Sequence, residues 1–141
     1  MQEQENESIF EENISPGALQ AIYETGRWGK MLAVAGYAIG AFVVIVVLFN
    51  GTTLFKTIER VMPVSLEGLY GLFITVFFIA FFIIAAILYF LYKGATLLQQ
   101  GAQQNNTTLI AEGFSFFKKF FLISAIVGSI GLLINIFTLL S

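Results

Sequence analysis

The sequence predicts an all-α integral membrane protein with three transmembrane helices. Hydrophobic residues make up 57% of the 141 residues and charged residues only 11%, whereas soluble domains carry about 25% charged residues. Three charge-free runs are each close to or above the ~20 residues needed to cross a ~30 Å hydrocarbon core. These runs cover residues 31–49, 68–92 and 120–141.

Residues 1–14 are predicted to form an acidic, disordered tail. Five of the nine glutamates fall in this stretch, and it is too poor in apolar residues to build a packed core. The remaining residues, 15–141, are predicted to form one helical membrane domain, because the chain is long enough for a single domain at most.

Residues 15–30 predict an N-terminal amphipathic helix at the membrane interface. Ser15 followed by Pro16 is typical of a helix start. Three apolar residues then recur at helical spacing: Leu19, Ile22 and Tyr23. The alternative is that this stretch is a plain extension of the first span, which is itself expected to end at Asn50-Gly51.

The two connectors between the spans differ in length. Residues 51–67 predict one or two helical turns that end before Pro63. Residues 93–119 predict a helical hairpin that projects from the bilayer, with its turn at Asn105-Asn106 and a second helix starting at Thr107 or Thr108. Five apolar residues are expected to pack across this hairpin: Leu97, Leu98, Leu109, Ile110 and Phe114.

The distribution of lysine and arginine predicts the orientation. Five of these cations flank the side of the N-terminus and the hairpin, and two flank the other side. Because positive residues stay in the cytoplasm, we expect a cytoplasmic N-terminus and hairpin and an external C-terminus. The expected interfacial anchors are Arg27, Trp28, Lys30, Tyr92, Lys93, Lys118 and Lys119. Glu24, three residues before Arg27, is expected to form an ion pair with it.

Small and weakly polar residues are the candidates for helix packing or for a pore. Gly36 and Gly40 have GxxxG spacing, which fits intramolecular packing, a contact between copies, or chance. A second stripe falls on one face of the last span, and it consists of Ser124, Gly128, Gly131 and Asn135. Helix packing, with Asn135 bonded to a neighbouring helix, is the preferred interpretation of this stripe, and a polar pathway is the alternative.

Several chemistries are excluded or disfavoured. The chain has no Cys and no His, which excludes disulfides and the thiolate and imidazole ligands of metals. It has no basic patch for nucleic acid. No span contains a charge, which argues against carboxylate-coupled transport and voltage sensing. Gly26 and Gly29 superficially resemble a phosphate loop, but the Gly-Lys-Ser/Thr ending is missing. Without paired carboxylates or a nucleophile with its base, we expect neither an enzyme nor a cofactor.

Two segments share a recognisable pattern: ETGRWGKMLAVAGY (24–37) and YFLYKGATLLQQGAQQNNTTLIAEGFSFFKKFFLI (89–123). The pattern is a Gly-Arg-Trp anchor before the first span, a span ending in Tyr-Lys, and a polar hairpin that closes on Phe-Lys-Lys-Phe. It resembles a family of small multi-pass bacterial membrane proteins of Bacteroidetes-like bacteria, catalogued as a domain of unknown function. The resemblance covers residues 20–140. It implies the bacterial cytoplasmic (inner) membrane and supplies no activity.

Two functions follow as hypotheses. The first is a non-enzymatic accessory or scaffold subunit, which associates in the lipid bilayer with a membrane-protein partner or with further copies of itself and uses the hairpin tip as a docking surface. The alternative is a small homo-oligomeric channel or transporter in which the stripe of Ser124 to Asn135 faces a pore.

Overall fold

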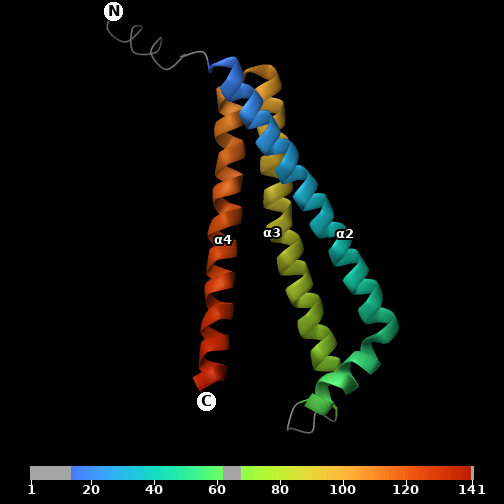
Figure 1. Ribbon diagram of the computed structural model, residues 1–141. Coiled ribbons are helices and arrows are strands. Elements are labelled where there is room, and N and C mark those ends of the chain that lie inside the picture. Colours follow the sequence, from blue (N-terminus) through green and yellow to red (C-terminus); the bar gives the residue numbers. More distant parts are fainter. Residues whose placement is uncertain (1–13, 62–67, 141) are drawn as a thin grey trace, which may run out of the picture.

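The computed structural model describes residues 14–61 and 68–140, which form three long α-helices (Figure 1). α2 spans Pro16–Val61, α3 spans Tyr70–Gln104 and α4 spans Thr107–Leu140. At ~1.5 Å per residue the helices are about 50 to 70 Å long, well beyond a ~30 Å hydrocarbon core. Each is apolar enough to cross a membrane, and the described ranges contain no strand. The all-helical class and the three long apolar helices are therefore confirmed.

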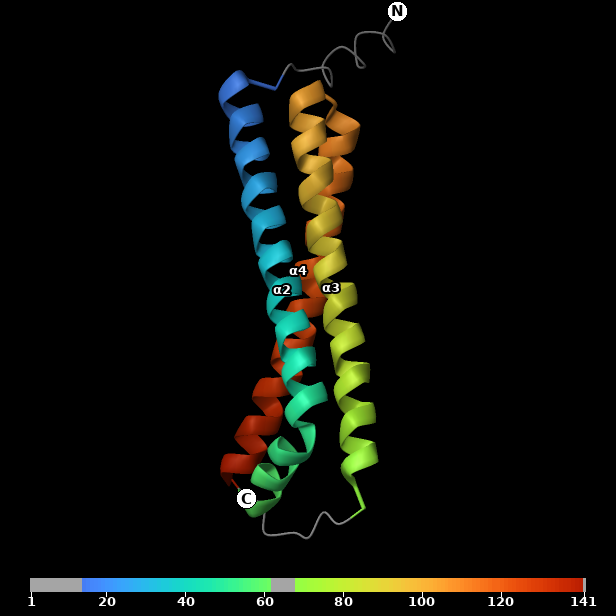
Figure 2. The same cartoon turned by 90° about the vertical axis from the view of Figure 1, so that its right-hand side faces the viewer.

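α3 is the central helix of the three. It packs on α2 along one side and on α4 along another. The three helices lie together around the hairpin turn, and α4 then diverges from α3 toward its C-terminal end (Figures 1 and 2). The first residues of α2 and the last residues of α4 lie at opposite ends of the molecule (Figure 1).

α2 runs without a break from Pro16, so a separate interfacial helix over residues 15–30 is not confirmed. The predicted helix start is present, because the Ala18 N–H donates to Ser15 Oγ at 3.2 Å. The apolar residues Leu19 and Ile22 pack against buried residues contributed largely by the hairpin. The arms of the hairpin run beside this stretch and offer it an apolar surface, which favours a straight continuation of the helix. Of the predicted acidic tail, only Ile14 lies within the described residues, and it packs on the same residues.

The first span and the helical turns predicted after it form one continuous helix, α2, with no end at Asn50-Gly51. Helix continues through Asn50-Gly51 to Val61, because a single glycine costs a helix only about 1 kcal/mol. Packing compensates for this cost: Phe55 is buried, and its ring centroid lies 5.5 Å from those of Tyr70 and Phe73 on α3. Figure 1 shows this end of α2 turning toward the start of α3. The predicted stop before Pro63 falls outside the described residues.

The turn between α3 and α4 lies at Asn105-Asn106, as the sequence predicts. Asn105 takes the left-handed conformation, with φ 48°, which asparagine tolerates better than most residues. The side-chain oxygen of Asn106 accepts the N–H groups of Thr108 and Leu109, at 3.0 and 3.1 Å. It thereby satisfies two of the donors that a helix N-terminus leaves unpaired.

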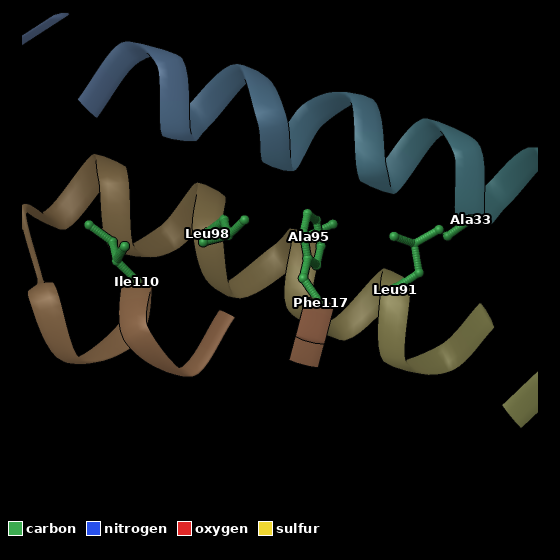
Figure 3. Close-up of a cluster of buried hydrophobic side chains, with 6 residues drawn as sticks. All are labelled: Ala33, Leu91, Ala95, Leu98, Ile110 and Phe117. Carbon is green, nitrogen blue, oxygen red and sulfur yellow. The ribbon is translucent and has the colours of Figure 1, made fainter. Parts of the chain in front are cut away.

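Buried apolar side chains gather where the three helices meet (Figure 3). We call this cluster the hairpin core; it consists of Ala33, Leu91, Ala95, Leu98, Ile110 and Phe117. Leu98 and Ile110 belong to it, as expected, but Phe114 is 47% exposed. On α4 the buried face is formed by Ile110, Gly113 and Phe117. Phe114 falls at the edge of this face because successive residues are about 100° apart around a helix.

Candidate functional site

α3 and α4 cross at a pair of facing glycines. A Cβ atom added to Gly94 would lie 2.9 Å from the carbonyl oxygen of Gly113, and one added to Gly113 would lie 3.0 Å from the carbonyl oxygen of Gly94. A Cβ atom on Gly101, nearer the turn, would lie 2.8 Å from the backbone nitrogen of Ile110. The hairpin is therefore held by direct backbone contact, which small residues permit.

α2 packs on the hairpin through two further glycines, Gly26 and Gly29, which are both buried. A Cβ atom on Gly26 would lie 2.7 Å from the carbonyl oxygen of Ala95, and one on Gly29 would lie 2.9 Å from Cζ of Phe117. Close packing explains why these positions are glycine, and no phosphate loop is needed to account for them.

None of these five contact glycines is predicted as a packing residue from the sequence. The predicted small-residue contacts lie within the charge-free runs, whereas these five glycines lie outside the runs. One signal was available: Gly94 and Gly101 are seven residues apart, which places them on the same face of a helix.

Gly36 and Gly40 lie at the interface between α2 and α3. The nearest atoms to added Cβ atoms would belong to Leu88, at 2.9 Å, and Phe81, at 3.3 Å. Both glycines line an apolar groove of about 340 Å³, which also includes Tyr37, Ile39, Val43, Phe77, Ala80, Ile84 and Ala85. The sequence left three interpretations of this GxxxG pair open. In the described structure the two glycines lie in an intramolecular contact between α2 and α3.

Tyr37 makes a polar contact across this interface. Its hydroxyl donates to the carbonyl oxygen of Ala85 at 3.0 Å. We expect Tyr37→Phe to lower the free energy of unfolding by about 0.5–1 kcal/mol, because interhelical hydrogen bonds in membrane proteins have this magnitude. Unfolding in SDS, followed by circular dichroism, measures the change. Tyr89→Phe is the matched control, since Tyr89 is 50% exposed; an equal loss in both variants would contradict the assignment.

The two glycines of the predicted stripe on α4 are not covered by any described helix, and Ser124 of the same stripe is half-buried. Cβ atoms added to Gly128 or Gly131 would meet nothing within 4 Å, and none of residues 121–140 is buried. Asn135 Nδ2 donates to the carbonyl oxygen of Gly131 in its own helix, at 2.9 Å. The expected hydrogen bond from Asn135 to a neighbouring helix is therefore not made within the described part of the chain.

The structure brings several of the expected interfacial anchors together across helices. Lys30 Nζ lies 5.6 Å from the ring centroid of Tyr92. Lys93 Nζ and Lys119 Nζ lie 4.8 and 5.0 Å from the same ring, that of Phe116. Such cation–π contacts help to hold the lysine side chains against the helices. Arg27, Trp28 and Lys118 are exposed, Trp28 by 62%.

The expected ion pair between Glu24 and Arg27 is not made among the described residues. A carboxylate oxygen of Glu24 instead accepts a hydrogen bond from Gln20 Nε2, at 3.2 Å. Gln20 lies one helical turn before Glu24, on the same face of α2. Its side-chain amide can therefore reach the carboxylate directly. Arg27 is left without a carboxylate partner in residues 14–61 and 68–140.

The candidate surfaces on the described residues are apolar or cationic. Within the described ranges no side chain of a polar or charged residue is buried, and no three His, Cys, Asp or Glu residues are grouped as metal ligands. The molecule offers two apolar surfaces with small residues, the groove at Gly36 and the stripe on α4, and a set of cations near the hairpin.

Comparison with known proteins adds no relative. No protein-family model, curated protein or solved structure matches this chain. The resemblance to a bacterial membrane protein family therefore stays a prediction.

Proposed function

We propose that the protein is a non-enzymatic subunit that assembles with other helices inside a membrane, through the stripe on α4. The observation that carries this proposal is the uncovered face of Gly128 and Gly131, where no other described part of the chain lies within 4 Å of an added Cβ atom. The contact glycines of the hairpin, by contrast, are filled by neighbouring backbone and side chains. A second helix can approach α4 as closely at the stripe as α4 approaches α3 at Gly94.

The environment of Asn135 supports a partner helix at this stripe. Apart from the bond of Nδ2 to its own helix, the amide has no hydrogen-bond partner among the described residues. Hydrocarbon offers no water to satisfy it, and polar side chains in membrane helices bond across helices for this reason. A partner helix with a polar residue at the same depth would supply the missing bond.

Charge supports the orientation that forms part of this proposal. Arg27, Lys30, Lys93 and Lys119 lie near the hairpin, while Lys56 and Arg60 lie near the opposite end of α2. The rule for positive residues then puts the hairpin and the N-terminus in the cytoplasm and the end of α4 outside. The family resemblance extends the proposal to the bacterial inner membrane.

A double substitution of the stripe tests this function. Gly128→Leu with Gly131→Leu should block close helix approach and lower the fraction of protein recovered with its partner at least about tenfold, since helix association depends on small residues. Affinity purification from native membranes after cross-linking measures that fraction, whether the partner is another protein or a second copy.

The matched control is Ala125→Leu with Ser129→Leu. These two exposed residues are four positions apart on one face of α4, and this face lies about 90° or more around the helix from the stripe. We expect this variant to assemble normally. A parent protein that cross-links to nothing, or an equal loss in both variants, would show that the stripe is not a docking surface. Ion flux through vesicles reconstituted with the parent would favour the channel alternative.

A further inference from the structure

A second groove lies between α2 and α3, close to the hairpin. One part of it is lined by polar and charged residues and the other part by apolar residues. Its volume is about 520 Å³. Arg27 and Lys30 of α2 and Gln99 of α3 line the part nearer the hairpin turn. The rest is lined by α2 residues at the start of the charge-free run: Met31, Val34, Ala35 and Ala38. We call it the cationic groove.

The two cations of the cationic groove are not neutralised by the described residues. Arg27 and Lys30 are three positions apart on the helix, so both side chains reach the same patch of surface. Glu24, the nearest acid along the helix, is bonded to Gln20. Lys30 is partly buried, and its Nζ is kept 5.6 Å from the ring centroid of Tyr92. The pair therefore presents positive charge beside an apolar surface.

Gln99 adds a neutral donor to the same end of the cationic groove. Gly26 allows its side chain to lie against α2, because a Cβ atom on Gly26 would lie 2.9 Å from Cγ of Gln99. No hydrogen bond to the Gln99 amide is made by the residues that the structure describes. A guanidinium, an ammonium and an amide N–H₂ are three donors suited to the oxygens of a phosphate.

The apolar part indicates the source of that phosphate. It follows α2 directly from the cations into the predicted span, and Ala35 and Ala38 leave space beside the larger Met31 and Val34. A soluble phosphate would make no use of this surface, whereas a phospholipid carries an anionic headgroup and an acyl chain in the same order. A basic pocket between membrane helices is a known kind of lipid site.

We propose that the cationic groove binds one anionic phospholipid of the leaflet on the hairpin side. Arg27, Lys30 and Gln99 contact the headgroup phosphate, and an acyl chain lies along Val34 and Ala38. This site is separate from the stripe on α4, and it needs no protein partner.

Native mass spectrometry of the full chain in detergent, titrated with phosphatidylglycerol or with phosphatidylcholine of the same acyl chains, tests the proposal. We expect phosphatidylglycerol to bind at least about tenfold more tightly than phosphatidylcholine, because only the first carries net negative charge. Arg27→Gln with Lys30→Gln should weaken phosphatidylglycerol binding about 30-fold, which corresponds to about 2 kcal/mol for two cations near a headgroup.

Two controls separate the site from general effects of charge and size. Lys56→Gln with Arg60→Gln removes the same charges from the opposite end of the same helix and should leave binding unchanged. Ala38→Phe should fill the apolar part and weaken the binding of both lipids, while Ala125→Phe on exposed α4 surface should not.

Three results would overturn the lipid site. One is equal binding of the two lipids. Another is an equal loss in the Lys56 and Arg60 variant. The third is full competition by inorganic phosphate, which would make the groove a site for phosphate alone.

Discussion

Replacing Phe117 with alanine is expected to lower the free energy of unfolding by about 3 kcal/mol, the lower end of the range for a buried phenylalanine. The Phe117 ring belongs to α4 but reaches both other helices. A Cβ atom added to Gly29 of α2 would lie 2.9 Å from the ring, and one added to Gly94 of α3 would lie 2.7 Å from it. Its loss leaves a cavity at the point where the three helices meet (Figure 3).

The control for this cavity is Phe114→Ala, one turn earlier on the same helix. Phe114 is 47% exposed, and Phe117 is 9% exposed. We expect a change within about 0.5 kcal/mol for Phe114, as for most exposed positions. SDS titration followed by circular dichroism compares the two variants, and Phe117→Leu should fall between them. Equal losses from Phe117 and Phe114 would mean that the hairpin core does not hold α2 to the hairpin.

Replacing Gly94 with leucine is expected to cost about 3 kcal/mol, at the upper end of the usual range for overpacking. The contact at this position is with backbone: the Gly113 carbonyl oxygen would lie 2.9 Å from the new Cβ atom. Backbone in the middle of a helix cannot turn away as a side chain can, so α3 and α4 must move apart. Leu98 and Phe117, which pack beside this crossing, would lose contacts at the same time.

Gly94→Ala keeps this prediction testable if the leucine variant does not fold. Alanine should still destabilise the hairpin, even though it favours helix over glycine by about 1 kcal/mol. Gly71→Ala is the matched control, because an added Cβ atom there would meet no other described part of the chain within 4 Å. We expect it to be neutral or slightly stabilising in the same unfolding measurement. A Gly94→Ala protein as stable as Gly71→Ala would show that the two helices do not touch at Gly94.

These two predictions separate stability from assembly. The hairpin core and the glycine contacts lie around the hairpin, while the stripe on α4 lies in the diverging half of that helix (Figures 1 and 2). Gly128→Leu with Gly131→Leu should therefore change partner recovery and leave unfolding nearly unchanged. Phe117→Ala should do the reverse, provided that the protein remains folded.

The sequence by itself determined the class of this protein, the start of α2 and the turn between α3 and α4. Charge-free runs of spanning length need only composition to be recognised, because each apolar residue favours the hydrocarbon independently of its neighbours. Ser15 and Asn105-Asn106 were predictable for a similar reason, since a helix cap and a turn depend on residues within a few positions of each other. No comparable local signal marked the continuation of α2 through Asn50-Gly51, because its support comes from the ring of Phe55 against α3.

Only the tertiary structure decided which small residues are contacts and which are uncovered. Gly113 and Gly128 look alike in the sequence, yet a Cβ atom on Gly113 would meet the backbone of α3, whereas one on Gly128 would meet no other described part of the chain within 4 Å. The difference arises because two straight helices touch where they cross and then separate. The crossing point depends on packing between residues far apart in the chain, such as Gly29 and Phe117. Composition and spacing show which helix faces carry small residues. They do not show which of these faces another helix contacts.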